Sequence, residues 1–198
     1  MGARGHLFTS GSQRSDASHP VQQDESMTDS RFRIHPSPVG DILIVTTATG
    51  IVELHPFEGP LGPHIERIAR ELHRAPEPDD TAGGDIDRQL DEYFAGDRRE
   101  FDVSLDWSRV RGFTRAALET VREIPYAETA SYGEVAAAAG SPRAARAVGT
   151  ACATTPFSII VPVHRVVRSD GSLGEYGGRS DVKRFLLDLE LDAIGNST

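Results

Sequence analysis

The first half of the chain begins its regular pattern at residue 31, where short alternating segments are separated by turn residues. The spacing predicts strands over Arg31–His35, Asp41–Thr47 and Ile51–His55. Ser-Pro-Val-Gly and Ala-Thr-Gly turns divide these segments, as expected for an antiparallel meander. A further alternating run, Phe101–Asp106, predicts a later strand.

Two helices are expected between these strands. Leu61–Arg74 carries apolar residues at helical spacing. Asp85–Phe94 does the same, with Gly96 in the position that stops a helix. The pattern therefore predicts a small α+β domain that ends near Trp107.

The second half is predicted to be mainly helical. Phe113–Ile124 and Tyr132–Ala139 have helical apolar spacing. Ser141 and Pro142 suit the N-cap and the first position of a third helix, which would run to about Thr154. The tight turn between the last two helices is typical of a helix-turn-helix, and also of ordinary helix packing.

The helix after Pro142 is rich in small residues and carries Arg143 and Arg146, which are three positions apart and share a face. Small side chains and arginines fit a helix pressed into a nucleic-acid groove. The same residues fit equally well in a tightly packed pair of helices whose basic edge faces solvent.

The charge is distributed unevenly along the chain. The formal net charge is −9. Residues 1–108 hold 10 basic and 20 acidic residues, whereas residues 109–184 hold 11 basic and 7 acidic ones. A nucleic-acid contact, if present, is therefore expected in the second half.

The ends of the chain and its composition limit the class of protein. Residues 1–30 are polar, have no hydrophobic period and are expected to be disordered. No apolar run is long enough to span a membrane, and the N-terminus lacks the apolar core of a secretory signal, so a cytoplasmic protein is expected. Cys152 is the single cysteine, which excludes an internal disulfide and a cysteine-based zinc site. No metal or cofactor is expected.

Several ordered motifs together resemble the O6-alkylguanine-DNA alkyltransferase family over about residues 31–190. The segment DEYFAGDRREF (91–101) is similar to the end of the family's N-terminal domain. The motifs of its second domain resemble IPYAETASYGEV (124–135), AARAVG (144–149), PVHR (162–165), GSLGEYGG (171–178) and KRFLLDLE (183–190).

The resemblance implies an α+β fold with two domains. A small RNase H-like α/β domain would occupy residues 31–108. A mainly helical domain of the winged helix-turn-helix type would follow at 109–190 and bind DNA, with a tail at 191–198.

The family flips the damaged guanine out of the duplex, and the resemblance assigns residues to that process. Arg146 would enter the base stack, Arg143 would contact DNA, and Tyr132 would crowd the phosphate beside the flipped nucleotide. The lesion pocket would be lined by Pro162, Val163, Val166, Tyr176 and Gly177.

Val163 departs from the family pattern, because the Pro-Cys-His-Arg motif requires the nucleophilic cysteine at this position. A thiolate can displace an alkyl group from carbon, and a valine side chain cannot. His164 and Glu190 occupy the positions of the relay that activates the cysteine, and we expect them to be structural here. Thr155 replaces a second motif residue, an asparagine, and Cys152 resembles an inert, buried packing residue.

These features predict a relative without transfer activity that resembles the alkyltransferase-like proteins. It would bind double-stranded DNA carrying O6-alkylguanine, act as a monomer and mark the lesion for excision-repair proteins. Two alternatives stay open: a mutated or divergent alkyltransferase, and a protein-interaction module that no longer binds DNA.

Overall fold

The computed structural model describes residues 29–195. Most of the segment expected to be disordered, residues 1–28, lies outside that range. For Asp29 and Ser30 the prediction was wrong. Ser30 is buried, and its carbonyl accepts a hydrogen bond from the Glu77 backbone N–H at 2.9 Å, which extends the strand pairing backwards. Residues 191–195 of the predicted tail continue the last helix.

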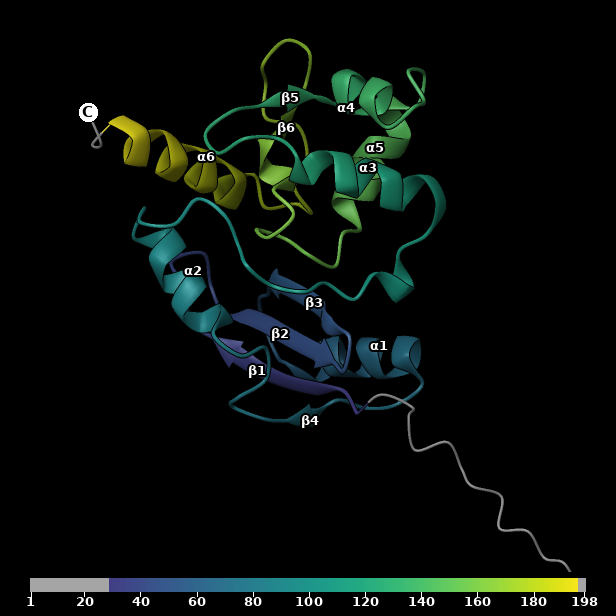
Figure 1. Cartoon of the computed structure of the whole chain (residues 1–198), viewed down its shortest axis with the longest axis vertical. Helices are drawn as coiled ribbons and strands as arrows, with labels where there is room; N and C mark the ends of the chain where they lie inside the picture. The colour runs from purple at the N-terminus through teal and green to yellow at the C-terminus, as the bar shows by residue number, and fades with distance from the viewer. Residues whose placement is uncertain (1–28, 196–198) are drawn as a thin grey trace, which may run out of the picture.

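The N-terminal half is built on a four-stranded sheet (Figure 1). Its strands are β1 (Arg31–His35), β2 (Ile42–Thr47), β3 (Gly50–Pro56) and the short β4 (Glu77–Pro78), in the order β3-β2-β1-β4. β1, β2 and β3 form the antiparallel meander predicted from the sequence, and β4 pairs parallel with β1.

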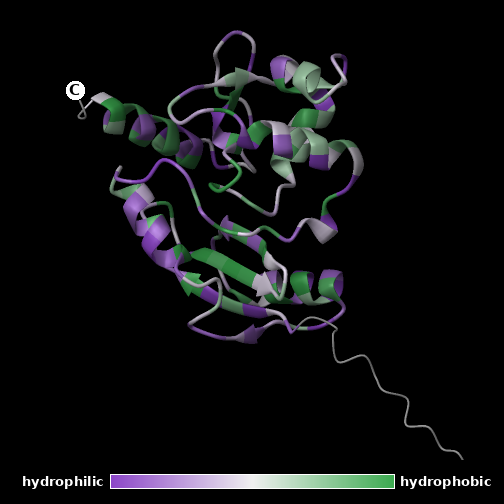
Figure 2. Ribbon diagram, viewed as in Figure 1, coloured by the Kyte–Doolittle hydropathy of each residue, from purple (hydrophilic) through white to green (hydrophobic). Residues whose placement is uncertain are grey.

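Both faces of this sheet are covered, which explains the continuous apolar run in β2. Helix α1 (Gly62–Leu72) packs on one face, where Leu43 and Val45 are buried. The opposite face, with Ile42 and Ile44, packs against α2 (Ile86–Phe94) and the second half of the chain. Figure 2 shows β2 as a hydrophobic strand between these layers.

The predicted strand over Phe101–Asp106 was wrong. The segment is extended, but its one ladder contact is an isolated bridge between Leu105 and Ile51. The Gln89 side chain takes the place of a neighbouring strand. Its Oε1 accepts from the Asp102 backbone N–H at 2.8 Å, and its Nε2 donates to the Asp102 carbonyl at 3.1 Å. A short 3-10 helix, η1 (Trp107–Arg109), follows.

The C-terminal half packs helices around a short buried segment. The elements are α3 (Gly112–Arg122), β5 (Ala130–Ser131), α4 (Tyr132–Ala138), α5 (Ala145–Ala153), the 3-10 helix η2 (Val163–Arg165), β6 (Val166–Val167) and α6 (Ser180–Gly195). β5 and β6 form a two-stranded parallel sheet beside α4. In Figure 1 this half lies above the four-stranded sheet, and α6 extends toward α2.

The predicted start of α5 was wrong. Residues 141–144 form a turn in which the Ala144 N–H donates to the Ser141 carbonyl at 2.8 Å, and α5 begins at Ala145. Pro142 therefore occupies the second turn position, which its fixed φ also suits. The start of α4 is fixed by a capping box in which the Ser131 side chain accepts from the backbone N–H of Glu134, whose carboxylate accepts from the Ser131 N–H.

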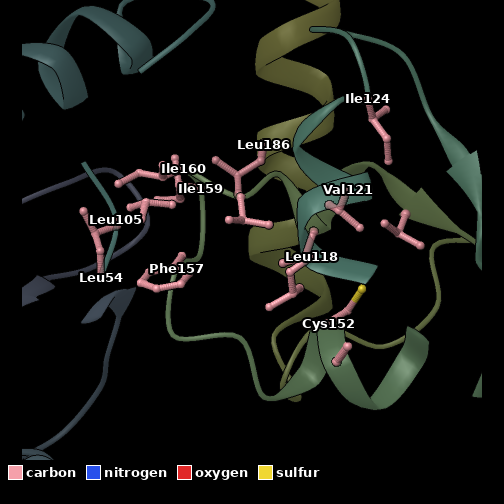
Figure 3. Packing of buried hydrophobic residues seen from close by; sticks show 14 of the residues in the cluster. Leu54, Leu105, Leu118, Val121, Ile124, Cys152, Phe157, Ile159, Ile160 and Leu186 are labelled. Atoms are coloured by element: carbon pink, nitrogen blue, oxygen red, sulfur yellow. The ribbon is translucent and has the colours of Figure 1, made fainter. Parts of the chain in front are cut away.

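One hydrophobic cluster runs through both halves (Figure 3). The Leu54 N–H donates to the Pro156 carbonyl at 2.6 Å, and the Trp107 and Phe157 rings lie edge to face with centroids 4.8 Å apart. The predicted α+β fold of two domains is confirmed. Within residues 29–195 there is no helix of the length and hydrophobicity needed to cross a membrane.

Candidate functional site

The segment that carries Val163 is fixed at the centre of the C-terminal half. Residues 159–167 are all buried. The chain folds back on itself there, because the Val161 N–H donates to the Phe157 carbonyl at 2.8 Å and Ile159 adopts a φ of 74°. Val163 opens η2 and keeps 3% of its surface exposed. The side chain at the nucleophile position is therefore held in one place.

His164 and Glu190 belong to a buried polar cluster that includes both domains. His164 Nε2 lies 2.8 Å from Glu190 Oε1. The Tyr93 hydroxyl, from α2, donates to the same oxygen at 2.7 Å. Arg165 donates from Nε and Nη2 to Glu190 at 2.9–3.3 Å, and the Ala127 N–H donates to Oε2 at 2.9 Å. Glu190 thus accepts several hydrogen bonds, while His164 Nδ1 is buried and has no partner in the part of the chain that the structure describes.

The electrostatics of this cluster favour a neutral imidazole beside a carboxylate. Burial lowers the pKa of His164, and the hydrogen bond to Glu190 offsets part of that effect. Burial alone would raise the pKa of Glu190, but hydrogen bonds from His164 and Arg165 lower it to about 2. Burial raises the pKa of the Tyr93 phenol. At neutral pH the histidine can accept a proton at Nδ1, but Val163 offers none.

A cleft of about 1030 Å³ opens beside Val163, between the two domains. Tyr176 and Gly177, which the resemblance places in the lesion pocket, line this cleft together with Val163. Pro162 and Val166 are buried and are not among its lining residues. Two of the five expected pocket residues therefore lie behind its wall, and a lesion-binding role for any of the five remains a prediction. The N-terminal domain also contributes lining residues, among them Glu53, His55, Arg67 and Glu71.

Tyr132 packs against backbone and is half-buried. A Cβ atom at Gly149 would lie 3.8 Å from the Tyr132 ring, and a Cβ atom at Gly174 would lie 2.7 Å from the Tyr132 hydroxyl. The Nζ atom of Lys183 lies 5.9 Å from the centre of the ring. Tyr132 does not line the cleft. Its hydroxyl is directed to the 171–178 loop, and its expected role at a DNA phosphate is untested.

Lys183, the only lysine of the chain, is fully buried. Its Nζ donates to the Val166 carbonyl at 2.6 Å, which ties α6 to the segment after Val163. Burial lowers the pKa of Lys183 to about 8. No role is predicted for Lys183 or Tyr93 from the sequence. Lys183 could have been found as a lone lysine within a family motif, whereas the contact of Tyr93 with Glu190 leaves no signal in the sequence.

Helix α5 presents the features expected of a nucleic-acid contact. Arg143, just before it, and Arg146, in its first turn, are exposed. The exposed face continues through Ala147, Thr150 and Ala153, whose side chains are small. A partner surface can approach this part of the helix backbone closely.

Cys152 borders the cleft from the opposite side of α5, with 8% of its surface exposed. Figure 3 shows its sulfur pointing toward α3 within the apolar cluster. Burial raises the pKa of the thiol to about 12. Because the thiolate is the reactive form, this cysteine is a poor nucleophile at neutral pH.

Thr155 also lines the cleft, and its hydroxyl accepts from the Phe157 N–H at 3.2 Å. This local bond fixes the turn after α5 but reaches no further. Among residues 29–195, no group of three histidine, cysteine or acidic side chains is placed to hold a metal ion.

Comparisons with known proteins identify the relatives of this chain. Residues 31–107 match the family model described as 6-O-methylguanine DNA methyltransferase, ribonuclease-like domain, and residues 112–191 match its DNA binding domain. The methylated-DNA--protein-cysteine methyltransferase of Mycobacterium tuberculosis is 40% identical over 80% of this chain and 91% of its own length. The chain belongs to the O6-methylguanine-DNA methyltransferase family.

Other family members extend the comparison. The methyltransferase of Methanosarcina acetivorans is 36% identical over 80% of this chain and 97% of its own. The crystal structure of Mycobacterium tuberculosis OGT in complex with DNA superimposes with a TM-score of 0.70 at 38% identity, covering 82% of this chain and 94% of that one. The protein is thus a member of a DNA-binding alkyltransferase family whose named relatives are transferases.

Proposed function

We propose that this protein binds O6-alkylguanine in duplex DNA, flips the nucleotide into the cleft and holds it beside Val163 without removing the alkyl group. The bound lesion would then be recognised by excision-repair proteins in the cytoplasm, at the nucleoid. The observation that carries the proposal is Val163 itself, which lines the cleft next to an intact His164–Glu190 pair.

Alkyl transfer needs a group that attacks carbon as guanine leaves. Val163 has no lone pair, and His164 and Glu190 can only move a proton that a thiol would have supplied. Cys152 is disfavoured as a substitute, because its thiol is buried and its pKa is raised to about 12. Recognition without transfer is the chemistry that these side chains support.

The residues that line the cleft support binding of the lesion. The methyl groups of Val163 offer an apolar contact to an alkyl group, at about 0.8 kcal/mol per buried methylene. The Tyr176 hydroxyl is buried, and within residues 29–195 it makes no hydrogen bond, although the Ser158 side chain lies near it. It is available to a polar atom of a flipped base.

Helix α5 supports binding of DNA. Its exposed face combines Arg146 with small side chains, and a planar guanidinium can stack in place of a base and hydrogen-bond to the unpaired partner. The DNA complex of the Mycobacterium tuberculosis relative supports a DNA partner for this domain.

The test is an equilibrium binding measurement at fixed salt with matched duplexes that contain O6-methylguanine or guanine. The parent protein should prefer the lesion. Arg146→Ala should bring the ratio of the two affinities close to one, because the arginine acts only when a base is extruded. Arg143→Ala is the matched control: loss of a phosphate contact should weaken both duplexes by a similar factor. Equal discrimination by the parent and Arg146→Ala would contradict the role of Arg146, and no lesion preference in the parent would contradict the proposal.

The absence of transfer is tested separately with an O6-benzylguanine oligonucleotide, by mass spectrometry of the protein. We expect no adduct on the parent, and a stoichiometric adduct on Val163→Cys, in which His164 regains a proton to accept. Cys152→Ala is the control for the remaining thiol. An adduct on Cys152 of the parent would show that the protein is a divergent transferase.

A further inference from the structure

The cleft is larger than a flipped base requires. Its volume of about 1030 Å³ lies at the upper end of the range for pockets that enclose whole small molecules. A guanine beside Val163 would leave space toward the N-terminal domain. The groups that border this remaining space therefore determine which O6 substituents fit.

Arg179 borders it, next to the expected base-binding residues. It stands at the end of the 171–178 loop, and its N–H donates to the Tyr176 carbonyl at 2.8 Å. Its side chain crosses to the N-terminal domain, where Nη2 donates to the Val39 carbonyl at 3.1 Å and pairs with Glu58 at 3.2 Å. Asp181 Oδ2 lies 3.9 Å from the same nitrogen. All of these contacts hold one end of the guanidinium.

A second donor group of Arg179 lacks a partner. Among the described residues, Nη1 is buried and makes no hydrogen bond. About a quarter of the whole side chain is exposed. A buried donor without a partner is costly, and a guanidinium satisfies it best with an oxygen acceptor. Since Glu58 neutralises the charge, a neutral oxygen suits this site as well as an anion would.

We propose that Arg179 determines the substituent specificity of the site by donating a hydrogen bond to an oxygen at the far end of the O6 substituent. The preferred lesions are then O6-hydroxyalkylguanines, with an apolar stem against Val163 and a terminal oxygen at Arg179. The inference rests on the proposed function and adds a substrate class to it.

Two isosteric pairs of lesions test this inference: O6-(hydroxyethyl)guanine against O6-propylguanine, and O6-(hydroxybutyl)guanine against O6-pentylguanine. In each pair, one substituent ends in a hydroxyl group and the other in a methyl group. For the parent, at least one pair should show a preference of about tenfold for the hydroxyl, as expected for a hydrogen bond to a charged donor. Arg179→Met, which keeps the length but removes the donors, should reduce the ratio to about one. Its discrimination between O6-methylguanine and guanine should stay unchanged.

Controls separate specificity from domain anchoring. Glu58→Gln removes the anchoring carboxylate but leaves the donors. Because Glu58 is largely exposed, this variant should change thermal stability little and keep the hydroxyl preference. If Arg179→Met does not fold, Arg179→Lys should lose the preference, because its ammonium group lacks the spare edge of the guanidinium. No preference in either pair for the parent, or an unchanged preference in Arg179→Met or Arg179→Lys, would overturn the inference. Failure of the parent to separate O6-methylguanine from guanine would instead contradict the proposed function.

Discussion

Replacing Glu190 by glutamine tests whether the buried cluster beside Val163 stabilises the fold. Glu190 accepts hydrogen bonds from Tyr93, Arg165 and Ala127 and lies 2.8 Å from His164. Glutamine has nearly the same shape but no charge. Arg165, which is buried, would keep hydrogen bonds and lose its counter-ion.

The expected loss of folding free energy is roughly 3 kcal/mol. Lowering the carboxyl pKa from 4.5 to about 2 corresponds to that amount by linkage. Removing one partner of a buried ion pair gives a similar figure, about 3–5 kcal/mol. In a chain of this size, each 1 kcal/mol shifts Tm by roughly 2–4 °C, so Glu190→Gln should melt roughly 6–12 °C lower.

The assay is urea unfolding of the parent and Glu190→Gln across a range of pH. Because the folded pKa lies below the unfolded one, the carboxylate stabilises the fold above pH 4.5 and loses this effect as the pH falls toward 2. The difference between the two proteins should therefore be full at neutral pH and shrink in acid. Glu119→Gln, which removes an exposed pair with Arg115, should cost at most about 0.5 kcal/mol. A loss below about 1 kcal/mol at neutral pH, or one that does not vary with pH, would show that the Glu190 carboxylate does not stabilise the fold in this way.

Two further predictions concern the contacts around Tyr132. Lys183→Met should destabilise the protein by about 1–3 kcal/mol, since it leaves the buried Val166 carbonyl without its donor. Burial lowers the pKa of Lys183 from 10.5 to about 8. In urea unfolding, the parent should therefore gain stability relative to this variant as the pH rises from about 8 to 10.5. Gly174→Ala should lower the free energy of unfolding by about 1–3 kcal/mol, measured by thermal unfolding. Gly174 has a φ of 68°, and a side-chain carbon there would lie 2.7 Å from the Tyr132 hydroxyl. Unchanged stability would show that Tyr132 is free to move.

Much of the fold follows from local patterns in the sequence. The apolar run in β2 and the turns around it are strong enough to place the meander. The run Phe101–Asp106 alternates as a strand does, yet only Leu105 forms a bridge to β3, and the Gln89 side chain satisfies the backbone groups of Asp102. Local alternation predicts an extended chain but cannot tell which group will satisfy its hydrogen bonds. Likewise, a proline after serine suits a turn as well as a helix start, and at Ser141–Pro142 it forms the turn.

The site was predictable only where its residues lie in family motifs. Val163, His164, Tyr176 and Glu190 were found in this way, although spacing alone would have left each as an ordinary core residue. The contribution of the N-terminal domain was not predictable. Tyr93 is 97 positions from Glu190, and Arg179 is 140 positions from Val39, so only the packed structure brings them together.

We propose that the protein recognises the lesion and leaves it unchanged. The intact mass of the protein recovered from its complex with a duplex containing O6-methylguanine, after a long incubation, tests this proposal. We expect a protein of unchanged mass, bound to DNA that still carries the methyl group. A protein heavier by one methyl group, on Cys152 or any other residue, would contradict it.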